Sequence, residues 1–184
     1  MNNILLTGKP RVGKSTVCKK VISYLEKKGV VAGLLTEEIR EKNERKGFRI
    51  ISIKTKETGI LSHVNIKEGP RVGKYGINLS DLENIGVSAI EDALESDFAV
   101  IDEIGPMELY SIRFKDAVRL ILDSDVPTLA TIHLKSRDPF VKYVKERKDC
   151  ELIYITYQNR DKLPMIISNK LEVFANERRN HKLL

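Results

Sequence analysis

The chain has 184 residues, of which 41% are hydrophobic and 32% are charged, and it carries a formal net charge of +6. This length predicts one domain over residues 1–184, and since the chain has neither an apolar run of ~18 residues nor a leader-like start, we expect a cytoplasmic protein that makes no contact with membranes. Basic residues are spread among 26 acidic ones and only 6% of residues are aromatic, which disfavours nucleic acid as a partner and suits small polyanions.

The first predicted elements are a buried strand at residues 3–7, a loop, and a helix whose apolar residues recur at helical spacing up to Leu25. The loop, Gly8-Lys9-Pro10-Arg11-Val12-Gly13-Lys14-Ser15, fits the P-loop pattern G-x-x-x-x-G-K-[ST] at every fixed position. Glycines let backbone N–H groups point inward at phosphate oxygens, and the helix start adds the positive end of its dipole. We therefore predict nucleotide binding here; the alternative is a glycine turn with incidental basic residues.

Two side chains of this P-loop have distinct expected tasks. Lys14 can reach the β- and γ-phosphates, and Ser15 can offer its hydroxyl to Mg²⁺. Because Mg²⁺ binds few protein oxygens and keeps several waters, the nucleotide completes its coordination. The predicted nucleotide-binding residues of this segment are Gly8, Lys9, Pro10, Arg11, Val12, Gly13, Lys14, Ser15 and Thr16.

The next predicted elements form a second buried strand and a sheet extension. The strand covers residues 30–36 and is followed by a charged turn at residues 41–46. Two shorter strands, at residues 48–54 and 58–63, are expected to form a hairpin. Ser80-Asp81-Leu82-Glu83 fits a capping box, which predicts a helix that continues to about Ser96.

The second half of the chain alternates strands and helices. Strands are predicted at residues 98–101, 128–132 and 152–155, with a helix after Gly105-Pro106 between the first two. Asp138-Pro139 predicts the start of a short helix that reaches about Lys148, and a last helix begins near Leu163. This alternation indicates an α/β fold with three layers, a mostly parallel sheet and a small antiparallel extension.

Ligands of a parallel sheet collect at the carboxyl ends of its strands, which directs attention to Asp102 and Glu103. Asp102 ends an apolar strand, as a Walker B aspartate does, and is predicted to hold Mg²⁺ together with Ser15. We expect Glu103 to orient and polarise the attacking water, and Lys14 to assist catalysis at the phosphates. The alternative for Glu103 is a cap or a salt bridge.

Polar residues end the other strands as well. Glu37, Glu38 and Arg40 either arrange water near the γ-phosphate or form a solvated turn. Thr131 either senses phosphate or bonds local backbone, and His133 is interpreted as a surface histidine. Asn159 and Arg160 follow the last strand, where they are expected to contact the base or ribose; the alternative is a helix cap by Asn159.

A second Arg-Val-Gly-Lys, at residues 71–74, is not a second P-loop. Gly69 and Gly73 are one residue too close together, and Tyr75 replaces the hydroxyl residue that binds Mg²⁺. Arg71 or Lys74 is expected either to stabilise charge on the triphosphate or to belong to a solvated basic turn.

Composition adds two observations. Cys18 and Cys150 match neither a disulfide scaffold nor a zinc site, so we interpret both as buried or inert thiols. The charged fraction and the single glutamine, Gln158, are typical of heat-adapted proteins, although a genome biased towards lysine and isoleucine gives a similar composition.

Together these segments resemble one family, the nucleoside-triphosphatases first described from thermophiles and also called cancer-related nucleoside-triphosphatases. The resemblance spans nearly the whole chain, and its most specific parts are residues 102–109 and 71–76. It implies a RecA-like core and slow, Mg²⁺-dependent hydrolysis of several nucleoside triphosphates. The other matching segments are the P-loop, Thr36-Glu37-Glu38-Ile39-Arg40, Gly47-Phe48-Arg49, Ala130-Thr131-Ile132 and Asn159-Arg160-Asp161.

We therefore predict a monomer that hydrolyses ATP, GTP and other nucleoside triphosphates to diphosphate and phosphate with broad base specificity. A nucleotide or nucleoside kinase is the first alternative, and a nucleotide-gated binding module with slow hydrolysis is the second. A GTPase is disfavoured, because Asn169-Lys170-Leu171-Glu172, which nearly fits N-K-x-D, lies inside the last predicted helix.

Overall fold

All strands within residues 2–182, the part of the chain that the computed structural model describes, belong to one nine-stranded sheet. Its order is β5-β6-β4-β3-β2-β7-β8-β1-β9. The strands are β1 (Asn3–Thr7), β2 (Val31–Glu41), β3 (Glu44–Ser52), β4 (Thr58–His63), β5 (Arg71–Val72), β6 (Tyr75–Ile77), β7 (Phe98–Ile104), β8 (Thr128–Ile132) and β9 (Cys150–Tyr154).

Five strands, β2, β7, β8, β1 and β9, form the parallel part of the sheet. β8 lies between β1, which leads into the P-loop, and β7, which carries Asp102 and Glu103. The predicted α/β fold with a mostly parallel, RecA-like core is confirmed. Because parallel strands end at the same edge, the ends of β1, β8 and β7 meet beside the P-loop.

The remaining strands form the antiparallel extension, and the predicted hairpin of β3 and β4 is confirmed. The predicted charged turn at residues 41–46 is wrong in its extent, because β2 runs on to Glu41 and β3 begins at Glu44. Lys42 and Asn43, both with positive φ, make the turn between them. Cross-strand ion pairs such as Arg45 with Glu38, 2.9 Å apart, stabilise this polar ladder.

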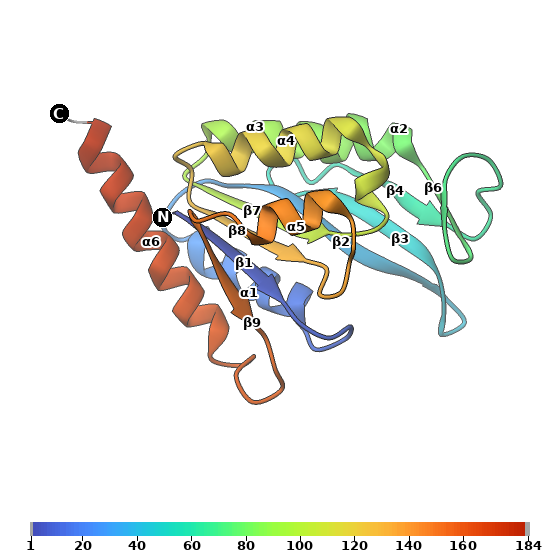
Figure 1. Ribbon diagram of the computed structural model, residues 1–184, viewed down its shortest axis with the longest axis horizontal. Helices are drawn as coiled ribbons and strands as arrows, with labels where there is room; N and C mark the ends of the chain where they lie inside the picture. Colours follow the sequence, from blue (N-terminus) through green and yellow to red (C-terminus); the bar gives the residue numbers. More distant parts are fainter. Residues whose placement is uncertain (1, 183–184) are drawn as a thin grey trace.

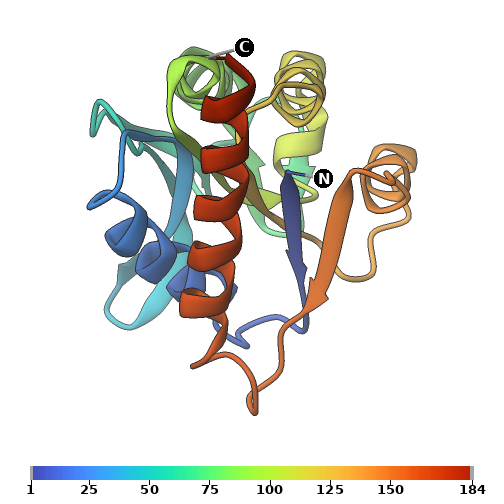
Figure 2. The same ribbon diagram turned by 90° about the vertical axis from the view of Figure 1, so that its left-hand side faces the viewer.

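Helices cover both faces of the sheet, as Figures 1 and 2 show from two sides. α1 and α6 pack together on one face, and the helical segments around α3 and α4 cover the other. The segments are α1 (Lys14–Leu25), α2 (Leu79–Asp81), the π-helical η1 (Leu82–Val87), α3 (Ser88–Asp92), η2 (Ala93–Glu95), η3 (Glu108–Tyr110), α4 (Ile112–Asp123), α5 (Pro139–Lys145) and α6 (Leu163–Lys182).

Alternation along the central strands divides the core in two. Leu5 of β1 packs with the side that holds α4 and α5, whereas Ile4 and Leu6 pack with α1 and α6. Both faces of β1 are therefore apolar, as expected of a strand buried between two helical layers. This burial fixes the strand that launches the P-loop.

The N-cap predicted for α5 is confirmed, whereas the N-cap predicted near α2 is not. The Asp138 carboxylate accepts the backbone N–H of Phe140 at 2.8 Å, as predicted. The predicted capping box at Ser80 is wrong: Asn78 is the N-cap and its side chain accepts the N–H of Asp81 at 3.0 Å. None of the helices within the described residues is both long and apolar enough to span a bilayer.

Candidate active site

The P-loop curls around the start of α1. Arg11 and Gly13 both have positive φ, and Gly13 caps the helix that begins at Lys14. The Lys14 ammonium folds back to the carbonyl of Gly8, with Nζ 3.4 Å from the oxygen. Gly8 is buried against Ile155 of the chain that follows β9, where a Cβ atom would meet the Ile155 carbonyl oxygen at 2.8 Å. The loop is thus held in a ring open to a phosphate group.

Asp102, near the end of β7, is buried with 1% of its surface exposed. Thr131 at the end of β8 donates a hydrogen bond to its Oδ1 at 3.1 Å, whereas Oδ2 is buried and has no hydrogen-bond partner among the described residues. Burial raises the pKa of Asp102 to about 6; the hydroxyls of Ser15 and Thr131 and the charge of Lys14 oppose that rise, and the charge of Glu103 adds to it. Ser15 and Asp102 are therefore brought together.

The hydroxyl oxygen of Ser15 and the carboxylate of Asp102 fit the Mg²⁺ that the sequence predicts. Oδ2 of Asp102 is an orphaned, buried acceptor, and a bound cation would satisfy it. Within residues 2–182 no group of three or more His, Cys, Asp or Glu side chains could hold a metal ion by itself. A site with few protein ligands suits Mg²⁺, which takes its other ligands from water and phosphate.

Glu103 is the second member of the acidic pair and is half-buried. Burial raises the pKa of Glu103, while the positive charge of Lys14 lowers it. Its carboxyl group lies directly against the backbone of Gly105. The structure thus places Glu103, Lys14 and Asp102 close enough to influence one another's charge.

Glu108 is a third carboxyl group at this site, which the motif analysis did not single out. It is 4% exposed, and burial together with the negative charges of Glu103 and Asp102 raises its pKa to about 8, although hydrogen bonds from backbone N–H groups oppose the rise. Burial therefore favours the protonated, neutral form of Glu108. In the sequence, the only sign of this buried position is that Glu108 stands between two apolar residues, Met107 and Leu109.

His133, which the sequence predicts to be a surface histidine, follows β8. The residue is half-buried, and its Nδ1 atom is buried with no hydrogen-bond partner among the described residues. Burial lowers the pKa of His133, and the charges of Lys14 and Lys145 lower it further. The insertion of β8 between β1 and β7 brings this residue towards the P-loop.

The charged residues of β2 serve the sheet extension. Glu38 accepts hydrogen bonds from Arg40 at 2.8 Å and from Arg45 at 2.9 Å, and Arg45 also donates to the Tyr75 hydroxyl at 2.9 Å. These contacts hold the pKa of Glu38 below its usual value against a rise from burial. Glu37 instead pairs with Lys19 of α1, so of this group only Glu37 contacts the helix that follows the P-loop.

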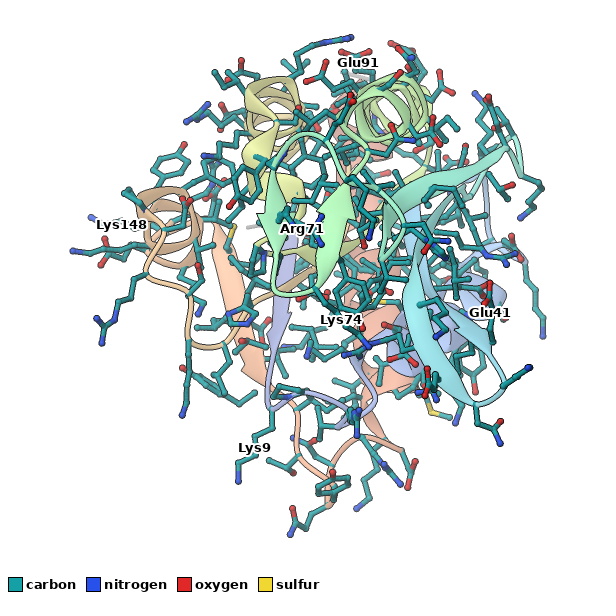
Figure 3. The ribbon with its side chains drawn as sticks, turned by 90° about the vertical axis from the view of Figure 1, so that its right-hand side faces the viewer. Lys9, Glu41, Arg71, Lys74, Glu91 and Lys148 are labelled. Carbon is teal, nitrogen blue, oxygen red and sulfur yellow. The ribbon has the colours of Figure 1, made fainter. Side chains whose placement is uncertain are left out.

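The hairpin of β5 and β6 lies on the side of the molecule from which the P-loop also emerges, as Figure 3 shows with Arg71, Lys74 and Lys9. Arg71 donates to the carbonyls of Ile66 at 2.8 Å and Lys74 at 2.7 Å, so its guanidinium braces its own hairpin. Tyr110, just beyond the acidic segment, donates to the Arg71 carbonyl at 3.3 Å. The hairpin is therefore tied to the segment that carries Glu103.

Asn159 and Arg160 occupy the loop after β9 and differ in what they touch. The side chain of Asn159 accepts the N–H of Thr156 at 2.8 Å and donates to the Tyr154 carbonyl at 2.9 Å. Asn159 thus braces the loop, and its contact with the base or ribose stays a prediction, since its amide keeps a second N–H and a second lone pair. Arg160 lies over the Tyr157 ring, 5.1 Å from its centroid, and donates to the Val12 carbonyl of the P-loop at 3.5 Å.

The residues that nearly fit N-K-x-D lie within α6, as predicted. Lys170 pairs with Glu151 and Glu172 pairs with Lys28, so both charges are used in helix packing. The two cysteines are free thiols, and burial raises the pKa of Cys18 well above its usual range and that of Cys150 to about 11. Neither residue is poised as a nucleophile.

Comparison with known proteins gives a consistent result. A family model described as NTPase matches residues 3–168. A nucleoside-triphosphatase THEP1 of Methanosarcina acetivorans is 49% identical over 172 residues, which cover 92% of this chain and 97% of the relative. The crystal structure of THEP1 from Aquifex aeolicus superposes with a TM-score of 0.83 at 36% identity, covering 92% of this chain and 99% of that one. The solution structure of a human cancer-related nucleoside triphosphatase gives a TM-score of 0.77 at 34% identity, covering 91% and 96%.

Proposed function

This chain belongs to the nucleoside-triphosphatase family and is a hydrolase, and we propose that it cleaves ATP, GTP and other nucleoside triphosphates to diphosphate and phosphate with Mg²⁺. The observation that carries the proposal is the meeting of Lys14, Ser15, Asp102 and Glu103 around the P-loop. In this proposal residues 1–184 act as one monomeric, cytoplasmic domain.

Each of these side chains has a role that follows from its position. Backbone N–H groups of the P-loop and Lys14 bind the β- and γ-phosphates. Ser15 and Asp102 would hold Mg²⁺, which when bound neutralises charge on the phosphates. Glu103 accepts a hydrogen bond from the attacking water and aligns it with phosphorus. Burial raises the pKa of Glu103, which makes it a stronger proton acceptor than an exposed glutamate.

Broad base specificity is supported by the groove beside the P-loop. Thr16, Lys20 and Tyr24 of α1 line it on one side, and Lys162, Pro164 and Met165 on the other. Apolar and flexible side chains of this kind offer contact area without a fixed pattern of donors and acceptors. The N-K-x-D-like residues, which a guanine reader would need in a loop, are packed in α6.

The test is phosphate release from ATP, GTP, CTP and UTP by the wild type, Glu103→Gln and Glu91→Gln. Glu91 is an exposed glutamate on α3, so its variant controls for the loss of a negative charge. We expect all four substrates to be hydrolysed, with a loss of about 10²–10⁴-fold in kcat for Glu103→Gln and no loss for Glu91→Gln. Calorimetry should show that Glu103→Gln still binds a non-hydrolysable triphosphate with Mg²⁺.

Three outcomes would contradict the proposal. Unchanged turnover in Glu103→Gln would remove the role of Glu103. Strict preference for one base would contradict the broad specificity. Transfer of phosphate to an added nucleoside or nucleotide in place of water would favour the kinase.

A further inference from the structure

The backbone at the end of β8 is held by three different elements. Thr7, directly before the P-loop, donates its hydroxyl to the Ile132 carbonyl at 2.9 Å. The N–H of His133 bonds the carbonyl of Ile104 in β7 at 3.1 Å. Lys145 of α5 donates to the carbonyls of His133 and Leu134, both at 2.8 Å. His133 is therefore fixed relative to both the P-loop and the acidic strand.

The side chain held there carries an unsatisfied atom. Nδ1 of His133 is buried without a hydrogen-bond partner among the described residues, and so is Oδ2 of Asp102 on the adjacent strand β7. Buried polar atoms in native proteins are nearly always paired, because an unpaired one loses its hydrogen bonds to water. A ligand that carries both a cation and an acceptor oxygen would satisfy these two orphaned atoms on neighbouring strand ends.

The positive charge near His133 suits the phosphate end of such a ligand. Positive charge on Lys14 acts on the imidazole, so the ammonium that would bind the β- and γ-phosphates lies close to it. Burial and the positive charges of Lys14 and Lys145 lower the pKa of His133, which favours the neutral form of the imidazole with one N–H. A neutral donor beside a lysine suits an anionic oxygen.

We propose that Nδ1–H of His133 donates a hydrogen bond to a terminal phosphate oxygen of the bound nucleoside triphosphate. His133 thereby distinguishes triphosphate from diphosphate, because a diphosphate leaves Nδ1 unpaired again. Product is then held less tightly than substrate, which favours its release. This inference rests on the proposed function and extends it to the discrimination between substrate and product.

The experiment compares nucleotide affinities rather than rates. Calorimetry with Mg²⁺ measures Kd for a β,γ-imido triphosphate and for the matching diphosphate in the wild type, His133→Ala, His133→Asn and His133→Gln. The Asn amide nitrogen can take the place of Nδ1, whereas Gln reaches towards Nε2. His63→Asn, a half-buried histidine at the end of β4, controls for the loss of an imidazole.

We expect His133→Ala to weaken triphosphate binding by about 10- to 100-fold, the effect of losing a hydrogen bond to a charged group, with diphosphate affinity unchanged. Diphosphate binding also confirms that the variant is folded. His133→Asn should restore most of the lost triphosphate affinity. His133→Gln should behave like His133→Ala, and His63→Asn should behave like the wild type.

Two results would overturn the inference. A ratio of the two Kd values that stays within twofold of the wild type in His133→Ala would overturn it and leave the proposed hydrolase intact. A wild-type protein that binds no triphosphate would overturn the proposed function, and this inference with it.

Discussion

Glu103 packs directly over Gly105, so that a Cβ atom on Gly105 would stand 2.8 Å from Oε1 of Glu103 and 2.9 Å from its Cγ. Gly105 does not have the positive φ that would by itself require glycine. Glycine is required here because the Glu103 side chain fills the space that a Cβ atom would occupy. A residue with a side chain at this position would displace the carboxyl group that we assign to the attacking water.

We predict that Gly105→Ala lowers kcat by about tenfold or more and costs about 1–3 kcal/mol in the free energy of unfolding, because Cγ and the carboxyl group of the Glu103 side chain must both shift. Steady-state kinetics and urea denaturation measure the two quantities. Gly86→Ala, in the helical segment η1, adds a methyl group away from the site and should retain full activity. An active Gly105→Ala enzyme would mean that the position of Glu103 is not critical.

The buried acid Glu108 predicts a pH dependence of stability. Its pKa of about 8 in the folded chain lies above its ordinary value of 4.5, so between these two values the folded state keeps a proton that the unfolded state loses. The free energy of unfolding therefore falls as the pH rises through this window. Glu108→Gln cannot ionise and should escape this fall.

Denaturation at pH 6 and pH 9 tests this relation. Relative to the wild type, Glu108→Gln should gain about 2 kcal/mol in unfolding free energy between the two pH values. Glu68→Gln, at an exposed position between β4 and β5, should show no such gain. Parallel pH profiles for Glu108→Gln and the wild type would mean that Glu108 is ionised at neutral pH.

The sequence predicts those parts of the fold that local pattern determines. The apolar run of β8 matches its observed bounds at residues 128–132, and the P-loop lies between β1 and α1 as expected. The antiparallel extension was harder, because Glu38 and Arg40 read as a solvated turn. Both residues lie in β2, which pairs with Arg45 of the neighbouring strand β3. The local sequence around Glu38 and Arg40 does not reveal this contact.

The candidate site divides in the same way. A fixed spacing reveals Lys14 and Ser15, and an apolar strand ending in acids reveals Asp102 and Glu103. Glu108 carries no such signal, because its raised pKa arises from burial, and His133 ends an apolar strand without showing which residues lie beside it, since that depends on the insertion of β8 between β1 and β7. Strand order is a property of the whole chain, and so residues that depend on it emerge only in three dimensions.

We predict that Lys145 holds the end of β8 in position. Lys145→Met removes the donor that bonds the carbonyls of His133 and Leu134, so we expect a loss of about 1–3 kcal/mol in unfolding free energy. The affinity ratio for triphosphate over diphosphate should fall as well, because His133 loses its support. Lys142→Met, an exposed lysine of the same helix, is the control for both measurements. Lost stability with an unchanged ratio would leave Lys145 a structural role only.

We predict a large loss of stability for a substitution at Gly33, because two central strands lie in close contact there. Gly33 of β2 has φ of +118°, and a Cβ atom on it would lie 2.1 Å from the carbonyl oxygen of Val100 in β7. Neither backbone can move without separating β2 from the strand that carries Asp102. We expect Gly33→Ala to cost more than about 4 kcal/mol in unfolding free energy, measured by urea denaturation.

Gly73→Ala separates the two causes of the lost stability, which are the positive φ and the close contact between strands. Gly73, in the hairpin of β5 and β6, also has a positive φ of +56°, but a Cβ atom there would meet nothing within 4 Å. Its alanine variant should cost only the ~1–2 kcal/mol of a left-handed residue. If Gly33→Ala were no less stable than Gly73→Ala, close packing of β2 on β7 would not be what requires glycine, and backbone conformation alone would account for it.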